Sequence, residues 1–130
     1  MEIDLPGVLA EVKLAFERSE EALTANDVEV LHVLFHDDPR TIRYGGGENL
    51  YGYAEVKAFR SARSAANLER TTAKTVITTY GHDFAVASTL FFRKTAPGKV
   101  GRQMQTWAKF ADGWKVVAAH VSVIDEPKAS

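Results

Sequence analysis

The sequence predicts an α+β domain in which helices from the first half of the chain pack on one face of a sheet from the second half. Two observations predict this class. Apolar residues recur at helical spacing as far as about residue 63, and long runs of β-branched and aromatic residues take over from Thr71. A strongly twisted sheet of this kind curls into a cone around its helices, so we expect a ligand to bind in the mouth between the two layers.

Three helical segments are expected before residue 64. The first begins at Pro6, and Ser19 takes a place in its apolar stripe where a hydrophobic residue is expected. The second covers about residues 28–35 and ends at the sequence HDDP, and the third covers residues 53–63. A short β-rich segment, residues 41–44, lies between the second and third helices and runs into three glycines.

Four strands are expected after residue 70. The candidate segments are residues 71–80, 84–94, 102–110 and 114–124. The separators GHD, PG and ADG are typical of hairpin turns, so the strands should be antiparallel and joined in series. We assign residues 1–126 to a single domain and residues 127–130 to a loose C-terminal tail.

Composition excludes several classes of function. The chain has 130 residues and a formal net charge of −1, so no strong field draws it to nucleic acid or to an anionic membrane. It has no cysteine, which excludes disulfides, thiolate nucleophiles and cysteine-ligated metals. The sequence shows neither an export signal nor a membrane span, and we therefore expect a cytoplasmic protein.

The glycine run stands in the sequence RYGGGENLYG, residues 43–52. A phosphate-binding loop would need a lysine and a hydroxyl residue at fixed offsets after the glycines, and neither is present. We interpret the run as a tight turn that needs positive φ between a strand and the third helix. Arg43, just before it, shares a strand face with Thr41, while Tyr44 lies on the other face. Arg43 is then either a buried guanidinium that needs an anion or an exposed edge-strand arginine.

Polar residues on the last two strands are candidates for a pocket. Gln103, Gln105 and Trp107 share one face, a pattern that suits a small polar ligand better than a plain core. In the last strand, strict alternation places His120 and Ser122 on the face of Trp114, and leaves an aliphatic opposite face. Because both faces are partly apolar, we expect one to cover the helices and the other to form a subunit interface. His120 is either a pocket residue or a satisfied core histidine.

Two other groups of residues are given simpler interpretations. Arg60 and Arg63, on the third helix, either crowd positive charge near the mouth or are solvated surface arginines, which is the interpretation that we favour. His32 and His36 are four residues apart, but they suit a polar helix end better than a metal site. We expect no metal and no cofactor.

Four motifs in order give the chain a family resemblance. RYGGGENLYG, AFRSAR, GRQMQTW and GWKVVAAHVS resemble the AtzH-like family (also called HpxZ-like, or DUF3225) of the nuclear-transport-factor-2 (NTF2) superfamily. The likeness runs nearly from end to end. It implies an NTF2-like cone, three N-terminal helices packed on a strongly curved, mainly antiparallel sheet, and a homodimer formed across the outer sheet face. It also implies a role beside amidase-signature hydrolases in cyanuric acid, ureide or oxalurate catabolism.

The resemblance further implies an activity and places for it. For one branch of the family the proposed activity is decarboxylating amide hydrolysis of a dicarboxylated urea to allophanate. The family's strand arginine falls on Arg43, which favours the pocket for that residue. The family's first helix often carries a tyrosine in the sequence FERYE, whereas this chain has FERSE, with Ser19 at that position.

The predicted site follows from these observations. Arg43 and Ser19 are the predicted catalytic residues. The predicted substrate-binding residues are Tyr44, Gln105, Trp107, His120 and Ser122. The expected ligand is a small carboxylated urea or amide, such as 1,3-dicarboxyurea, and the leading hypothesis is a cofactor-free decarboxylating amidohydrolase that acts on it. The alternative is a non-catalytic accessory or ligand-binding subunit that supports an amidase-signature hydrolase. An isomerase or dehydratase ranks last, because it would need a buried Asp or His base in the mouth and only His120 qualifies.

Overall fold

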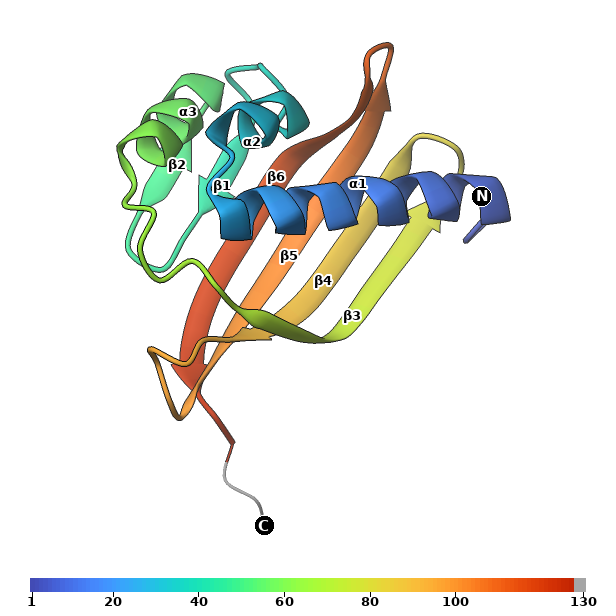
Figure 1. Cartoon of the computed structure of the whole chain (residues 1–130). Helices are drawn as coiled ribbons and strands as arrows, with labels where there is room; N and C mark the ends of the chain where they lie inside the picture. Colours follow the sequence, from blue (N-terminus) through green and yellow to red (C-terminus); the bar gives the residue numbers. More distant parts are fainter. Residues whose placement is uncertain (128–130) are drawn as a thin grey trace.

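The computed structural model describes residues 1–127, which form three helices and one six-stranded sheet (Figure 1). The elements, in chain order, are α1 (Pro6–Ala25), α2 (Val28–Leu34), β1 (Ile42–Tyr44), β2 (Asn49–Tyr51), α3 (Tyr53–Ala62), β3 (Thr71–Tyr80), β4 (Phe84–Phe92), β5 (Lys99–Phe110) and β6 (Gly113–Asp125). The strand order is β2-β1-β6-β5-β4-β3, and only β1 pairs in parallel, with β6. The predicted fold, with helices on one face of a mainly antiparallel sheet, is confirmed. Of the predicted tail, residues 128–130 lie outside the described residues.

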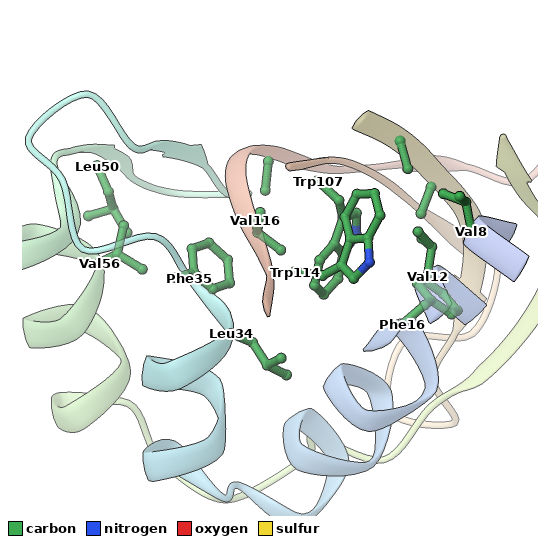
Figure 2. Packing of buried hydrophobic residues seen from close by; sticks show 13 residues of the cluster. Val8, Val12, Phe16, Leu34, Phe35, Leu50, Val56, Trp107, Trp114 and Val116 are labelled. Carbon is green, nitrogen blue, oxygen red and sulfur yellow. The ribbon is translucent and has the colours of Figure 1, made fainter. Parts of the chain in front are cut away.

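The helices cover one face of the sheet at two places. Figure 1 shows α1 crossing the face formed by β3–β6, whereas α2 and α3 lie at the end of the sheet that holds β1 and β2. The main core fills the space beneath α1, where Val12 and Phe16 face Trp107 and Val116 (Figure 2). Val12 and Val116 are fully buried, and each such side chain stabilises the fold by about 1.5–3 kcal/mol.

A β-bulge in the last strand decides which side chains face the helices. Thr106 of β5 pairs with Ala118 of β6, but the next residue, Trp107, pairs with Val116. Val117 is therefore an extra residue in β6, and the alternation of side chains reverses there. Val116 points to the core before the bulge and Ala119 points inward after it, so the strict alternation assumed from the sequence is wrong for the second half of β6.

The three glycines form the turn between β1 and β2, and none of them has positive φ. The run is a turn, as expected, but it does not need positive φ, and it connects two strands rather than a strand and the third helix. Gly52, with a φ of 88°, occupies the N-cap of α3 instead. Its amide donates to the carbonyl oxygen of Thr41, which fixes the start of α3 against β1.

None of the helices within residues 1–127 combines the length and the apolar character needed to cross a membrane.

Candidate functional site

A cavity of about 180 Å³ lies between the sheet and the three helices. Liquid water occupies about 30 Å³ per molecule, so the space corresponds to about six waters and suits a small ligand. Its floor includes Arg43, Ala119 and Gln105, which lie in one row across β1, β6 and β5. Its walls come from α1, α2, α3 and the segments that flank β3 and β4. The lining residues used below are Ser19, Glu20, Arg43, Glu48, Arg60, Arg63, Arg70, Phe91, Arg93, Gln103 and Gln105.

The cavity carries a strong positive charge. Five arginines and two glutamates are among the described residues that line it, which gives a formal charge of +3 (5 − 2) in a chain whose net charge is −1. The lining holds no lysine, aspartate or histidine within residues 1–127. Partly buried charges are poorly screened by solvent, so this concentration of guanidinium groups selects for anions.

Arg43 is held by an ion pair from its own hairpin. Its Nη1 donates to Glu48 Oε1 at 2.7 Å, and its guanidinium lies 5.4 Å from the centre of the Phe59 ring. The other oxygen of Glu48 accepts from the Gly47 amide at 3.2 Å. The Glu48 carboxylate folds back over Gly45, where a Cβ would lie 1.8 Å from Oε1. Gly45 is therefore needed for this ion pair and not for a special backbone conformation.

Arg70 is held by a second, separate network. Its Nε donates to Glu20 Oε2 at 3.2 Å, its Nη2 lies very close to Glu20 Oε1, and the same Nη2 donates to Gln103 Oε1 at 3.0 Å. The guanidinium groups of Arg70 and Arg93 lie 4.4 Å and 4.8 Å from the centre of the Phe91 ring. Both networks thus combine a carboxylate with an aromatic face.

The remaining three arginines of the lining form no ion pair with a carboxylate among the described residues. Nε and Nη1 of Arg60, Nε and Nη2 of Arg63, and Nε of Arg93 are buried without a hydrogen-bond partner among residues 1–127. Arg60 is only 5% exposed, and its guanidinium lies 4.9 Å from the centre of the Phe35 ring. Burial first, and then the positive charges of Arg43, Arg63 and Arg70, lower the pKa of Arg60 to about 9. Burial and neighbouring arginines also lower the pKa of Arg63 and of Arg93.

Ser19 lines the cavity from α1 and is 7% exposed. Its hydroxyl donates to the Phe16 carbonyl oxygen at 2.7 Å, one turn earlier in the helix. The proton of the hydroxyl is therefore in use, and its oxygen lone pairs remain available to accept a hydrogen bond from a ligand or a water.

The structure brings together only some of the residues that the sequence singles out. Gln105 lines the cavity beside Arg43, while Trp107 lies one row deeper, fully buried in the core, and donates from Nε1 to Gln105 Oε1 at 3.1 Å. Trp107 therefore orients Gln105 and does not itself line the cavity.

Tyr44, His120 and Ser122 lie on the opposite face of the sheet, and their placement in the pocket is corrected. The bulge at Val117 turns His120 and Ser122 outward. There the rings of His120 and Tyr44 lie nearly perpendicular to each other, with their centres 6.1 Å apart. The Tyr44 hydroxyl hydrogen-bonds to that of Tyr51, at 2.9 Å, and Ser122 accepts from Arg102. Tyr44 points outward because its neighbour Arg43 points inward in the same strand.

The sequence interpretation also missed residues of this cavity. Arg60 and Arg63 are not solvated surface residues, because both line the cavity. A signal for this was present, since they stand four residues after Val56 and Phe59, the apolar contacts of the same helix. Arg70 and Arg93 come from segments outside the regular strands, where spacing predicts no direction.

The two histidines, His32 and His36, have separate surroundings. Within residues 1–127 no group of three or more His, Cys, Asp or Glu side chains is arranged to hold a metal ion. His36 stacks on Phe110 with ring centres 4.0 Å apart, and its Nε2 lies 3.7 Å from Asp38. Nε2 of His32 is buried without a partner among the same residues.

The fold of the chain, three helices on one face of a mainly antiparallel sheet with a cavity between the layers, is NTF2-like. An NTF2-like protein from Cytophaga hutchinsonii ATCC 33406 has the same fold, with a TM-score of 0.67 and 23% identity over 87% of this chain and 95% of that one. The model of the AtzH-like family matches residues 1–127, so the chain belongs to the AtzH-like family.

Two solved structures are much more similar. A DUF3225-family protein from Pectobacterium atrosepticum SCRI1043 is 58% identical over 95% of both chains, with a TM-score of 0.92. A cystatin-like fold protein from Burkholderia xenovorans LB400 is 45% identical over 98% of this chain and 99% of that one, with a TM-score of 0.94. No curated protein matches the chain.

Proposed function

We propose that this protein binds a small carboxylated urea or amide, such as 1,3-dicarboxyurea, and catalyses its decarboxylation without a cofactor. The observation that supports this proposal is the formal charge of +3 in a cavity of about 180 Å³. A planar carboxylate matches the planar fork of a guanidinium, so an arginine-lined space of this size suits a small, planar, multiply charged anion.

The reaction needs a site that stabilises charge as it moves. In a carboxylated urea one carboxylate carbon is bonded to nitrogen. When that C–N bond breaks, carbon dioxide leaves, the electron pair stays on nitrogen and spreads to the urea oxygen, and a proton then forms the N–H. A dicarboxylated urea dianion thus takes up one proton and gives carbon dioxide and allophanate. Catalysis follows if the arginines bind the urea oxygen and the retained carboxylate more strongly in the transition state than in the substrate.

Arg43 and Ser19 are given different roles in this step. Arg43 uses Nη1 for Glu48, and an arginine has five N–H donors, so others remain for the urea oxygen. Ser19 Oγ accepts a hydrogen bond from a water molecule, and this water passes a proton from the solvent to the nitrogen, so that it remains water after the step. The serine does not itself give up its proton, which is donated to Phe16.

Turnover is tested by measuring carbon dioxide release from 1,3-dicarboxyurea against the spontaneous rate. Arg43→Gln should reduce the acceleration by about 10²–10³-fold, the loss typical of removing one charge-stabilising donor. Arg40→Gln is the matched control, because Arg40 also pairs with a carboxylate, that of Asp38, but is 88% exposed and lies outside the cavity. An Arg43→Gln enzyme as fast as the Arg40→Gln enzyme would refute the role of Arg43.

A second candidate function is that of a non-catalytic ligand-holding subunit of an amidase. It is favoured by one observation, that both carboxylates of the cavity are ion-paired and the Ser19 proton is already donated, so the described lining offers no free acid or base. Binding of the ligand without release above the spontaneous rate, together with co-purification with an amidase, would support this function over the first.

We also propose a homodimer formed across the outer sheet face. The support is a row of side chains across β3, β4, β5, β6 and β1, in which Met104 is 56% and Val76 is 57% exposed. The row consists of Val76, Ser88, Met104, His120 and Tyr44. Light scattering should give twice the chain mass of 14.3 kDa, and a single-chain mass would reject the dimer.

A further inference from the structure

Two of the five arginines that line the cavity are neutralised by the chain itself. Glu48 binds Arg43, and Glu20 binds Arg70. These are the only carboxylates among the described lining residues, and neither makes a hydrogen bond to Arg60 or Arg63. Residues 1–127 therefore supply no anion that pairs with Arg60 or Arg63, and a bound ligand can supply one.

Arg60 is the more deeply buried of the two arginines and lacks hydrogen-bond partners, among the described residues, for part of its guanidinium. It is 5% exposed, and two of its donor atoms, Nε and Nη1, are buried with no partner within residues 1–127. These two atoms point to different edges of the guanidinium, so each needs its own acceptor oxygen, whereas the fork that binds both oxygens of one carboxylate is formed by Nε and Nη2. Removing a charged group from water without pairing it carries a large energetic penalty, so evolution rarely retains such a residue as packing alone.

Arg63 adds a second unsatisfied guanidinium to the same place. Its Nε and Nη2 are also buried without partners among the described residues. After burial, the positive charge of Arg43 and then that of Arg63 lower the pKa of Arg60, and Arg43 is also the first charge that lowers the pKa of Arg63, so the three guanidinium groups are neighbours. Two like charges held near each other in a partly buried cavity are stabilised together by a single anionic group placed between them.

We propose that Arg60 and Arg63, beside Arg43, form a second anion-binding subsite that receives the second carboxylate of the ligand and makes the cavity selective for dianions over monoanions. The proposal rests on the anion-binding role given to the cavity under the proposed function, but it does not require turnover. Arg60 is a binding and specificity residue in this scheme.

The proposal makes an unusual prediction for the ligand-free protein. Replacing Arg60 with methionine removes an uncompensated buried charge and retains a side chain that packs on Phe35. Arg60→Met should therefore raise the melting temperature of the ligand-free protein, on the order of 5 °C. Arg70→Met is the matched control, because Arg70 is paired with Glu20, and its loss leaves that carboxylate without its partner. This variant should melt at a lower temperature than the wild type.

The binding test uses two unreactive probes, malonate as a dianion and acetate as a monoanion, in titration calorimetry at neutral pH and low salt. The wild type should bind malonate at least about tenfold more tightly than acetate, because a hydrogen-bonded charge pair is worth about a factor of ten or more. Arg60→Met should lose this preference. Arg60→Gln, a second neutral variant, should lose it as well.

Three results would overturn the proposal. They are a wild type with equal affinity for both probes, Arg60 variants that keep the preference for malonate, and an Arg60→Met protein that melts lower, as Arg70→Met does. Failure of the proposed function looks different. If malonate binding depends on Arg60 but no carbon dioxide is released above the spontaneous rate, the subsite stands and the decarboxylase does not.

Discussion

Gly45→Ala should break the ion pair between Arg43 and Glu48 without straining the backbone. The φ of Gly45 lies outside the left-handed region, so alanine fits the main chain. Its Cβ, however, would lie 1.8 Å from Glu48 Oε1 and 3.0 Å from Arg43 Nη1. Because the atom in the way is the end of a flexible side chain, the carboxylate moves aside and the fold is retained.

The size of the effect follows from the contacts that are lost. A hydrogen bond to a charged group contributes about 1.5–3 kcal/mol, and the Arg43 side chain is only 9% exposed, so solvent replaces little of it. The alanine also restricts the unfolded chain, which stabilises the protein by about 0.4–1 kcal/mol. The net loss is then about 1–2 kcal/mol, or about 3–10 °C in melting temperature for a chain of this length.

Gly46→Ala is the matched control in the same turn. A Cβ at Gly46 meets nothing within 4 Å, and its φ is also outside the left-handed region. It should therefore stabilise the protein slightly, by about 0.4–1 kcal/mol. Urea unfolding of both variants measures the difference, which should have opposite signs at the two neighbouring positions.

A double-mutant cycle separates the clash from any other effect of the alanine. In a Glu48→Ala background the carboxylate is absent, so Gly45→Ala should behave like Gly46→Ala and cease to destabilise. Equal stability of Gly45→Ala and Gly46→Ala in the wild-type background would refute the argument. Destabilisation that persists in the Glu48→Ala background would show that Gly45 is needed for another reason.

Two further predictions concern the cavity wall and the response to acid. Gly101→Ala places a Cβ 2.1 Å from ring atoms of the buried Phe91, and the guanidinium groups of Arg70 and Arg93 lie over this ring. The variant should therefore lower the free energy of unfolding in urea by about 1–3 kcal/mol and weaken malonate binding. Wild-type values for both would contradict this. Burial lowers the pKa of His32 below its ordinary value of about 6.5. The stability that the neutral imidazole contributes should therefore be present in full above about pH 6.5 and be lost as the pH falls through the lower pKa of the folded protein. His32→Gln should flatten the melting temperature between about pH 7 and 5, and an unchanged slope would exclude His32 as the cause.

The fold was predictable because its signals are local and repeated. Helical spacing marks α1 through Val12 and Phe16, and the hairpin turns mark the strands β3–β6. The inward face of β5 was also predictable, since Gln103, Gln105 and Trp107 alternate without interruption and all are buried. In these helices and strands the same spacing of buried residues continues from one end of the element to the other, so the direction of each side chain follows from that spacing.

The face of β6 could not be predicted, because the bulge leaves no mark in its composition. The sequence VVAAHVSV, residues 116–123, is apolar except at His120 and Ser122, and without the extra residue at Val117 strict alternation assigns these two to the face of Trp114. The consequence extends to the site, since the bulge moves His120 and Ser122 out of the cavity and brings Ala119 into it. A small residue at that position leaves the floor open beside Arg43.

The missed arginines show a different limit of sequence reasoning. Charged residues are usually exposed, and that general preference assigned Arg60 and Arg63 to the surface. The preference fails at a site that is built to receive charge, because there the stabilising partner is a ligand and is not encoded in the chain. Their position on the apolar side of α3, four residues after Val56 and Phe59, was the more informative observation.

The pairing of the arginines suggests how the cavity combines order with net charge. Arg43 and Arg70 are anchored by Glu48 and Glu20, so their guanidinium groups are held in place before any ligand arrives. Such preorganised donors stabilise charge in a reaction without needing to rearrange. Each anchoring carboxylate also cancels one positive charge, however, so a cavity with every arginine paired in this way would be neutral and would not attract an anion. The arginines without carboxylates supply the attraction, at a cost in stability to the ligand-free protein, and the variants at Arg60 and Arg70 measure these two contributions separately.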